Sequence, residues 1–232
     1  MTDQLRLALP SKGRLQEQAI AWFAARGITI RRSGLGREYA GKIDGLEGVE
    51  LRLLSAGEIP RELAAGRVHL GVTGQDLVRE KIPAWRARVE EIAELGFGHA
   101  DLVIAVPVSW VDVERVEDLD AVAAQFRATH GHRLRVATKY HTLVREFFRR
   151  EGIADWRIVD SQGATEGTIK TETAEIVADI TTTGETLRAN HLKNLDDGLI
   201  LKSQATLFGS LSAPTSPQID VTLAEVARRL GR

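Results

Sequence analysis

The sequence predicts an α/β fold built as two lobes. Short apolar runs of strand length alternate along the chain with amphipathic stretches of about ten residues, a spacing typical of strands joined by crossover helices. The chain has 232 residues, 43% of them hydrophobic, so it can bury one large core or two small ones. We therefore expect parallel sheets with ligand-binding loops at the carboxyl ends of the strands.

The first lobe is predicted to begin with a strand, a polar loop and a helix. The apolar residues within 5–9 alternate with polar or small ones, whereas those within 15–23 recur at helical spacing and Gly27 can end the helix. The elements expected next are strands at 28–32, 49–54 and 68–72 and a helix at 59–65 that begins near Pro60.

The second lobe continues the alternation. Strands are expected at 102–106, 134–138, 156–159 and 174–180, helices at 118–129, 142–150 and from Glu185, and a late strand at 198–202. The glycine-containing segment 96–99 is the best crossing point between lobes, and 193–197 is the best return point. The predicted lobes are residues 1–98 with 193–232, and residues 99–192.

Composition excludes several classes of function. The net charge of −1 gives no general attraction to nucleic acid or to an anionic membrane. Without cysteine there are no disulfides, thiolate nucleophiles or cysteine zinc sites, and the six histidines show no ligand spacing, so no metal site is assigned. The N-terminus lacks a secretory pattern and no stretch is long enough to span a bilayer, which predicts a cytoplasmic protein.

The segment 174–187 is predicted to form a phosphate cradle. A buried strand delivers Asp179 into a turn that is rich in hydroxyl groups and opens a helix. Gly184 allows the tight turn, and the carboxylate can accept hydrogen bonds from ribose hydroxyls. The residues of the proposed cradle are Thr181, Thr182, Thr183, Gly184, Glu185 and Thr186. The alternative is a threonine-rich helix cap without a ligand.

Other strand ends also carry polar groups. Lys12 and Arg14 flank Gly13 after the first strand, and Gly74 and Asp76 follow the strand at 68–72. Lys139 and Glu166 stand after two strands of the second lobe. Each group alone is commonly a solvated loop or a helix cap, but their concentration at strand ends favours a binding site. No nucleophilic triad is present, so positioning and electrostatics are favoured over covalent catalysis.

Taken in order, these segments resemble the short form of the ATP phosphoribosyltransferases. The motifs that carry the resemblance are residues 8–15 (ALPSKGRL), 70–76 (LGVTGQD), 136–140 (VATKY), 163–166 (GATE) and 179–187 (DITTTGETL). The last motif is the most specific, because an acidic residue followed by a Thr-Gly-x-Thr loop is how this family is thought to hold phosphoribosyl pyrophosphate. The resemblance extends from about Leu5 to Leu207.

The resemblance implies a glycosyltransferase of histidine biosynthesis. Its reaction would transfer the phosphoribosyl group of phosphoribosyl pyrophosphate to N1 of ATP and release pyrophosphate, with Mg²⁺ carried by the substrate phosphates. It also implies two lobes like those of type II periplasmic binding proteins, with the active site in the cleft between them. The implied catalytic residues are Lys12, Arg14, Asp179 and Glu166, and the implied substrate-binding residues are the 181–186 loop with Arg37, Gly74, Asp76 and Lys139.

The family resemblance also implies a partner. Only residues 209–232 follow Phe208, where long-form relatives carry a regulatory domain. Short-form relatives form a hetero-octamer with a regulatory subunit that resembles histidyl-tRNA synthetase, and we expect such a subunit here.

The sequence departs from the family pattern at four positions. Ser55 stands where many relatives have arginine; either Arg61 replaces that cation, or Mg²⁺ with Lys12 suffices. His141, Glu172 and Glu175 replace a usual proline, glycine and aspartate, and are expected to be loop or surface changes.

Two other functions fit the pattern. One is a non-catalytic module of the same two-lobed fold that binds a small ligand, since a fold does not determine a function. The other is a salvage phosphoribosyltransferase that acts on a free base. A substrate panel that follows pyrophosphate release separates these alternatives.

Overall fold

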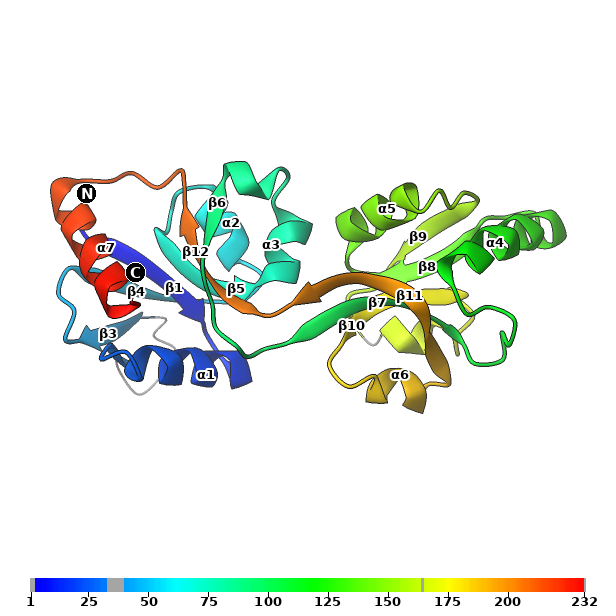
Figure 1. Ribbon diagram of the computed structural model, residues 1–232, viewed down its shortest axis with the longest axis horizontal. Coiled ribbons are helices and arrows are strands. Elements are labelled where there is room, and N and C mark those ends of the chain that lie inside the picture. Colours follow the sequence, from blue (N-terminus) through cyan, green and yellow to red (C-terminus); the bar gives the residue numbers. More distant parts are fainter. Residues whose placement is uncertain (1–2, 33–39, 164, 232) are drawn as a thin grey trace. The chain divides into compact units, whose positions relative to one another are not determined.

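The computed structural model describes residues 3–32, 40–163 and 165–231, and the chain divides into two compact units (Figure 1). Met1–Gly98 and Gln204–Arg232 form one unit and His99–Ser203 forms the other. The predicted return at residue 193 lies earlier than the observed division. The reason is β11 (Leu192–Ser203), a long strand that pairs with β7 (Ala100–Pro107) of the second unit from Leu192 to Ser203.

The first unit is a seven-stranded sheet with helices on both faces. The order of the strands in the sheet is β2-β3-β4-β1-β5-β12-β6. Its strands are β1 (Leu5–Pro10), β2 (Thr29–Arg32), β3 (Ala40–Asp44), β4 (Val49–Leu54), β5 (Leu70–Gly74), β6 (Val89–Glu94) and β12 (Ala205–Ser210). Its helices are α1 (Gly13–Ala24), α2 (Ile59–Ala64), α3 (Gln75–Lys81), the 3₁₀ turn η1 (Trp85–Ala87) and α7 (Pro217–Arg229).

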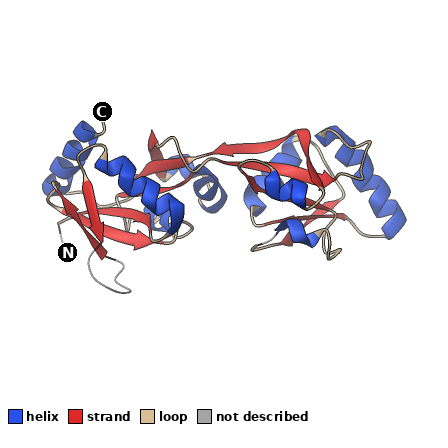
Figure 2. Ribbon diagram, turned by 90° about the horizontal axis from the view of Figure 1, so that it is seen from below, coloured by secondary structure: helices blue, strands red, loops and turns tan. Residues whose placement is uncertain are grey.

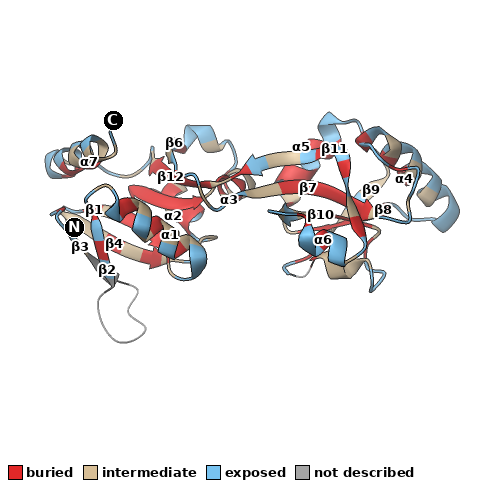
Figure 3. Cartoon of the chain, turned by 60° about the horizontal axis from the view of Figure 1, so that its bottom comes forward, coloured by how far each residue is buried: buried red, intermediate tan, exposed pale blue. Residues whose placement is uncertain are grey.

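Strand alternation explains the two cores of this unit. Leu5, Leu7 and Leu9 lie on one face of β1 and pack with α1 and α7, whereas Ala8 lies on the other face and packs with α2 and α3. Figure 2 shows the sheets of each unit in red with helices against them. Strand residues are buried along much of their length, while the outward faces of the helices are exposed (Figure 3).

The second unit is a five-stranded sheet in the order β11-β7-β10-β8-β9. The strands besides β7 and β11 are β8 (Leu134–Thr138), β9 (Trp156–Asp160) and β10 (Ile176–Thr181). The helices are α4 (Val116–His130), α5 (His141–Arg150), the 3₁₀ turn η2 (Thr165–Thr168) and α6 (Glu185–Ala189). Helices α4 and α5 pack on one face of this sheet through Leu119, Val144 and Phe148, and α6 packs on the other through Leu187.

The expectation of parallel sheets is correct only for the strands that carry the predicted loops. Strands β4, β1 and β5 are parallel, as are β10, β8 and β9, but β7, β11, β12, β2 and β3 form antiparallel pairs. The sequence prediction also missed β3, β6, β12 and α7. Direction depends on the partner strand, and periodicity within one strand does not encode it.

Candidate active site

The loop after β10 has the turn that the threonine-rich segment predicts. Gly184 has φ +71° and caps α6, and its backbone N–H donates to Thr181 Oγ1 over 2.8 Å. The left-handed backbone favours glycine at this position, whereas the one close neighbour of a Cβ there would be the movable end of the Arg188 side chain. Residues within the segment 181–184 therefore close this turn.

The hydroxyl groups of the loop differ in how they are used. Thr182 Oγ1 donates to the carbonyl of His99 over 3.0 Å, and Thr183 Oγ1 accepts a long 3.4 Å bond from the N–H of Glu185. Thr182, Thr183, Glu185 and Thr186 are exposed, and the hydroxyl of Thr186 has no partner among the described residues. The loop thus keeps oxygen and N–H groups accessible to a ligand.

Asp179 and Lys139 meet at the carboxyl edge of the second sheet. Asp179 lies near the end of β10 and Lys139 directly follows β8, and these two strands are parallel neighbours, so their ends lie side by side. Lys139 Nζ lies 3.8 Å from Asp179 Oδ1, which also accepts the N–H of Ile180 over 2.8 Å. The Asp179 side chain is only 16% exposed. These contacts to Oδ1 orient the carboxylate.

Glu166 lies at the same edge, next to two buried hydroxyl groups. It lies in η2, which contacts β10 and β8. Ser161 follows β9 and donates its hydroxyl to Thr165 Oγ1 over 3.2 Å, and its N–H donates to the Thr138 carbonyl over 3.1 Å. Ser161 and Thr165 are both buried. The sequence reasoning did not single out these two supporting residues. The available signal was their position, because both are polar residues in the segment that follows β9.

The predicted residues of the first unit lie at the carboxyl edge of its own sheet. Lys12 is the N-cap of α1, and Lys12, Gly13 and Arg14 are exposed. Parallel pairing of β1 with β4 and β5 places this loop between the ends of the two neighbouring strands, and the Ser11 N–H donates to the Leu54 carbonyl over 2.7 Å. Gly74 is the N-cap of α3.

Asp76 differs from the other predicted residues of this edge because it is buried, with 6% of its surface exposed. It stands in the first turn of α3, where a carboxylate is favourable. Arg37 lies outside the described residues.

A family model described as ATP phosphoribosyltransferase matches residues 55–231. The chain belongs to the ATP phosphoribosyltransferase family. It is 62% identical over 227 residues to the ATP phosphoribosyltransferase of Cereibacter sphaeroides, with 98% of this chain and 96% of the relative covered. It is 56% identical over 216 residues to that of Nitrobacter winogradskyi, with 93% of this chain but only 66% of the longer relative covered.

Solved structures agree with the fold of this family member. The ATP phosphoribosyl transferase (HisG:HisZ) complex from Thermotoga maritima contains a chain that superposes with a TM-score of 0.72 at 21% identity, covering 98% of both chains. The substrate-binding protein of an amino acid ABC transporter superposes with a TM-score of 0.53 at 12% identity, covering 98% of this chain and 92% of the other. The predicted likeness to periplasmic binding proteins is therefore confirmed at the level of the fold.

Ser55, one of the residues expected to depart from the family pattern, lies in the loop after β4, and the structure shows what surrounds it. Glu58 Oε2 accepts the N–H of Ser55 over 3.0 Å. Hydrogen bonding with the Ser55 side chain, and next with this N–H, lowers the pKa of Glu58. A cation also reaches the loop, because Lys81 Nζ at the end of α3 donates to the Gly57 carbonyl over 2.9 Å. Arg61 is exposed on α2 and makes no ion pair with any described residue. No sequence pattern indicated Lys81, because it is distant from this loop along the chain.

The structure also locates the other three departures. Glu175 lies in the loop before β10, as a loop or surface change would, but its side chain is only 13% exposed and its carboxylate accepts the Arg135 N–H over 2.7 Å and Arg135 Nε over 2.9 Å. Glu172 adopts φ +54°, the backbone conformation that glycine prefers. His141 Nε2 lies 2.8 Å from Asp160 Oδ1 at the start of α5.

Two searches over the described residues complete the account of the site. No group of three or more histidine, aspartate or glutamate side chains is placed to hold a metal ion within residues 3–32, 40–163 and 165–231. Over the same part of the chain, no helix has both the length and the apolar character that crossing a membrane requires.

Proposed function

We propose that this chain transfers the phosphoribosyl group of phosphoribosyl pyrophosphate to N1 of ATP and releases pyrophosphate, as a cytoplasmic enzyme of the first step of histidine biosynthesis. Family membership supports the proposal. The observation that carries it is the edge where Asp179, its Lys139 partner and the accessible 181–186 loop come together. An anionic sugar phosphate needs these two kinds of group, hydroxyl and N–H donors for the phosphate and a carboxylate for the ribose.

In this proposal the second unit positions the donor substrate. The hydroxyl and N–H groups of the 181–186 loop bind the 5′-phosphate, and Asp179 and Glu166 accept hydrogen bonds from the ribose hydroxyls. Lys139 orients Asp179 through their 3.8 Å contact. As the bond from C1 to the pyrophosphate oxygen breaks, the nearby carboxylates stabilise the positive charge that develops on the ribose.

Charge on the leaving pyrophosphate needs cations. Mg²⁺ enters with the substrate phosphates, which supply most of its oxygen ligands and leave room for one or two carboxylates. Lys12 and Arg14 are exposed at the end of β1 and are the proposed protein cations for phosphate contacts. Gly74 and Asp76 are proposed to bind the adenine of ATP. N1 of that adenine is then free to attack C1 of the ribose.

The test is pyrophosphate release from phosphoribosyl pyrophosphate with ATP or with free purines. We expect release with ATP only. Release with a free purine instead would support the salvage enzyme, and tight binding of either substrate without release would support a non-catalytic module.

Variants of the donor loop sharpen this test. Asp179→Ala and Thr186→Ala should each lose roughly 2–4 kcal/mol of transition-state stabilisation, since each removes an oriented contact from an accessible loop. Thr129→Ala is the matched control, because Thr129 is an exposed threonine of α4 in the same unit. Turnover within about twofold of wild type for both loop variants would remove the loop from the mechanism.

We also propose a regulatory partner that resembles histidyl-tRNA synthetase, in a hetero-octamer. The likeness to a chain of the HisG:HisZ complex supports a partner. The chain covers 96% of the Cereibacter relative, and so matches relatives of its own length as well as longer ones.

A further inference from the structure

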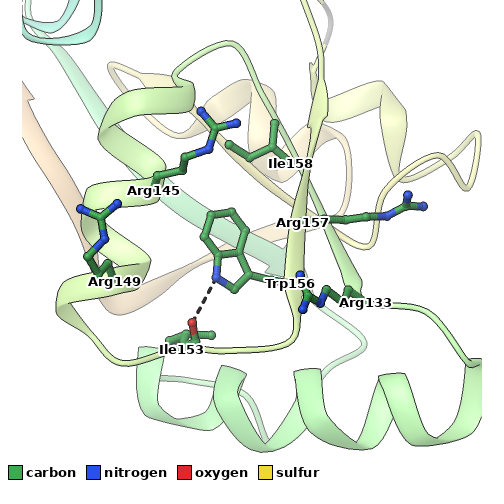
Figure 4. Close-up of a pocket in the computed structure, with 7 residues that line it drawn as sticks. All are labelled: Arg133, Arg145, Arg149, Ile153, Trp156, Arg157 and Ile158. Carbon is green, nitrogen blue, oxygen red and sulfur yellow. Dashed lines mark hydrogen bonds between the residues drawn. The ribbon is translucent and has the colours of Figure 1, made fainter. Parts of the chain in front are cut away.

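A groove between α5 and β9 in the second unit is lined by cations from three segments of the chain. Its volume is about 520 Å³, and Arg133, Arg145, Arg149 and Arg157 line it together with Trp156 and two isoleucines. Figure 4 shows the two α5 arginines, Arg145 and Arg149, on one side of the indole and Arg157 on the other. No acidic residue lines the groove.

The groove lies away from the carboxyl edge that holds Asp179. Helix α5 begins at His141, beside the end of β8, and runs back to Arg150, while β9 begins at Trp156 and ends at Asp160, which pairs with Thr138. Trp156 and the last turn of α5 are therefore at the opposite edge of the sheet. Lys139, Glu166 and the 181–186 loop take no part in the groove.

Most of these guanidinium groups lack an anionic partner. Arg145, Arg149 and Arg157 form no ion pair with any residue that the structure describes, and Arg133 is 4.0 Å from Asp155, which Arg127 also contacts. The helix dipole accounts for Arg149 in the last turn of α5, but Arg145 is a turn earlier and Arg157 is in a strand. Like charges gathered without partners favour an incoming anion.

The indole supplies a fixed apolar surface beside these cations. Trp156 Nε1 donates to the Ile153 carbonyl over 3.1 Å, and its ring packs 4.4 Å from the ring of Phe148. Guanidinium groups bind phosphate through paired hydrogen bonds, and an indole or guanidinium plane stacks on a nucleobase. The combination matches a ligand that carries a phosphate next to a flat ring.

We propose that this groove is a second nucleotide-binding site, separate from the catalytic edge and beyond the proposed reaction. Arg145 and Arg149 bind the phosphate, and the base lies against Trp156. A nucleotide bound there contacts α5, whose first residues follow Lys139 directly, so the site is placed to report the nucleotide level to the donor-binding edge.

The test uses the full chain labelled with 5-fluorotryptophan. The chain has four tryptophans, and Trp156→Phe assigns the fluorine resonance of Trp156. We expect AMP to shift that resonance saturably, and Arg145→Gln with Arg149→Gln to weaken the binding by roughly tenfold or more, because each charged hydrogen bond contributes over 1 kcal/mol. Arg150→Gln is the matched control: it removes an arginine of the same helix that pairs with Glu151 and does not line the groove.

Ligand variation completes the experiment. Adenosine should bind much more weakly than AMP for lack of the phosphate, and pyrophosphate more weakly for lack of the ring. The proposal fails if AMP leaves the Trp156 resonance unchanged, if the double variant binds AMP as wild type does, or if adenosine binds equally well. A stronger shift with polyglutamate than with AMP would overturn it in favour of an acidic protein segment.

The outcome is independent of the proposed reaction. Thr186→Ala, which tests the donor loop, should leave the AMP-induced shift of Trp156 intact. The double arginine variant should retain turnover measured without AMP. Loss of turnover in Thr186→Ala with no Trp156 shift in any form of the chain would therefore reject the second site alone.

Discussion

Ser55 lies in a loop that a cation reaches from another element. The loop after β4 carries Glu58 against the Ser55 N–H, which places a negative charge where the family resemblance led us to expect a positive one. Lys81 reaches the Gly57 carbonyl of this loop from α3. Our sequence hypothesis named Arg61, which is exposed and has no ion pair among the described residues.

We expect Lys81→Ala to lower turnover by about tenfold and Arg61→Ala to change it by less than about twofold, because only Lys81 is anchored at this loop. Adding Ser55→Arg to Lys81→Ala should recover part of the loss. Steady-state kinetics with both substrates measure the effect, and thermal unfolding checks that the loop still folds. Normal turnover in Lys81→Ala with a large loss in Arg61→Ala would reverse the assignment.

Glu172 has a backbone conformation that is unfavourable for a residue with a side chain. Its φ of +54° is strained for any residue with a Cβ, and the turn is retained by the bond from its N–H to the Ile169 carbonyl. Glu172→Gly should raise the free energy of unfolding by about 1 kcal/mol, since relief of the left-handed strain exceeds the entropy cost of glycine.

Ala124→Gly is the opposite control. Ala124 is exposed within α4, where glycine should lower stability by about 1 kcal/mol. Urea denaturation measures both. A lower stability for Glu172→Gly would show that the side chain contributes more than the backbone strain removes.

At the scale of elements, His69 joins three segments of the first unit. Its Nδ1 accepts the N–H of Arg6 in β1 over 2.9 Å, and its Nε2 lies 3.0 Å from the Pro214 carbonyl in the segment before α7. The imidazole therefore donates from Nε2, carries no proton on Nδ1 and is neutral. Burial lowers the pKa of His69, with the charge of Arg6 acting in the same direction and the bond to Pro214 opposing them.

The sign of the pH dependence follows from this lowered pKa. The unfolded chain binds the His69 proton at higher pH than the folded chain does, so stability is full above the ordinary pKa of about 6.5 and is lost as the pH falls below it. We expect the free energy of unfolding to decrease between about pH 7 and pH 5. In His69→Asn, whose amide oxygen can replace Nδ1, the profile should be flatter, and parallel profiles for the two chains would contradict this.

At the scale of the whole molecule, regulation is expected to depend on a second protein. If the proposed partner subunit exists, the purified chain alone should be insensitive to histidine, and addition of the subunit should introduce inhibition and change turnover. Mass photometry with and without the subunit measures assembly, and pyrophosphate release measures activity. Full inhibition of the isolated chain by histidine would contradict the proposal.

Much of the architecture could be predicted because it is local. The Leu5 to Leu9 alternation and the amphipathic face of α1 each occur within a few residues, and the glycine at position 184 carries its own turn geometry. Lys12, Arg14, Lys139 and Asp179 were found for the same reason, since each lies at or close to the end of a strand. By contrast, the prediction missed α7, although Ser216 and Pro217 begin this helix with an ordinary capping sequence.

The sequence by itself determined the α/β class, the positions of the strand-end loops, the turn at Gly184 and the family resemblance. Only the tertiary structure decided strand direction, the extension of β11 to Ser203, the contact of Lys81 with Gly57 and the gathering of four arginines around Trp156. The physical reason is the range of the interactions. Turns and periodicity depend on neighbours along the chain, whereas pairing, ion contacts and grooves depend on residues that only folding brings together.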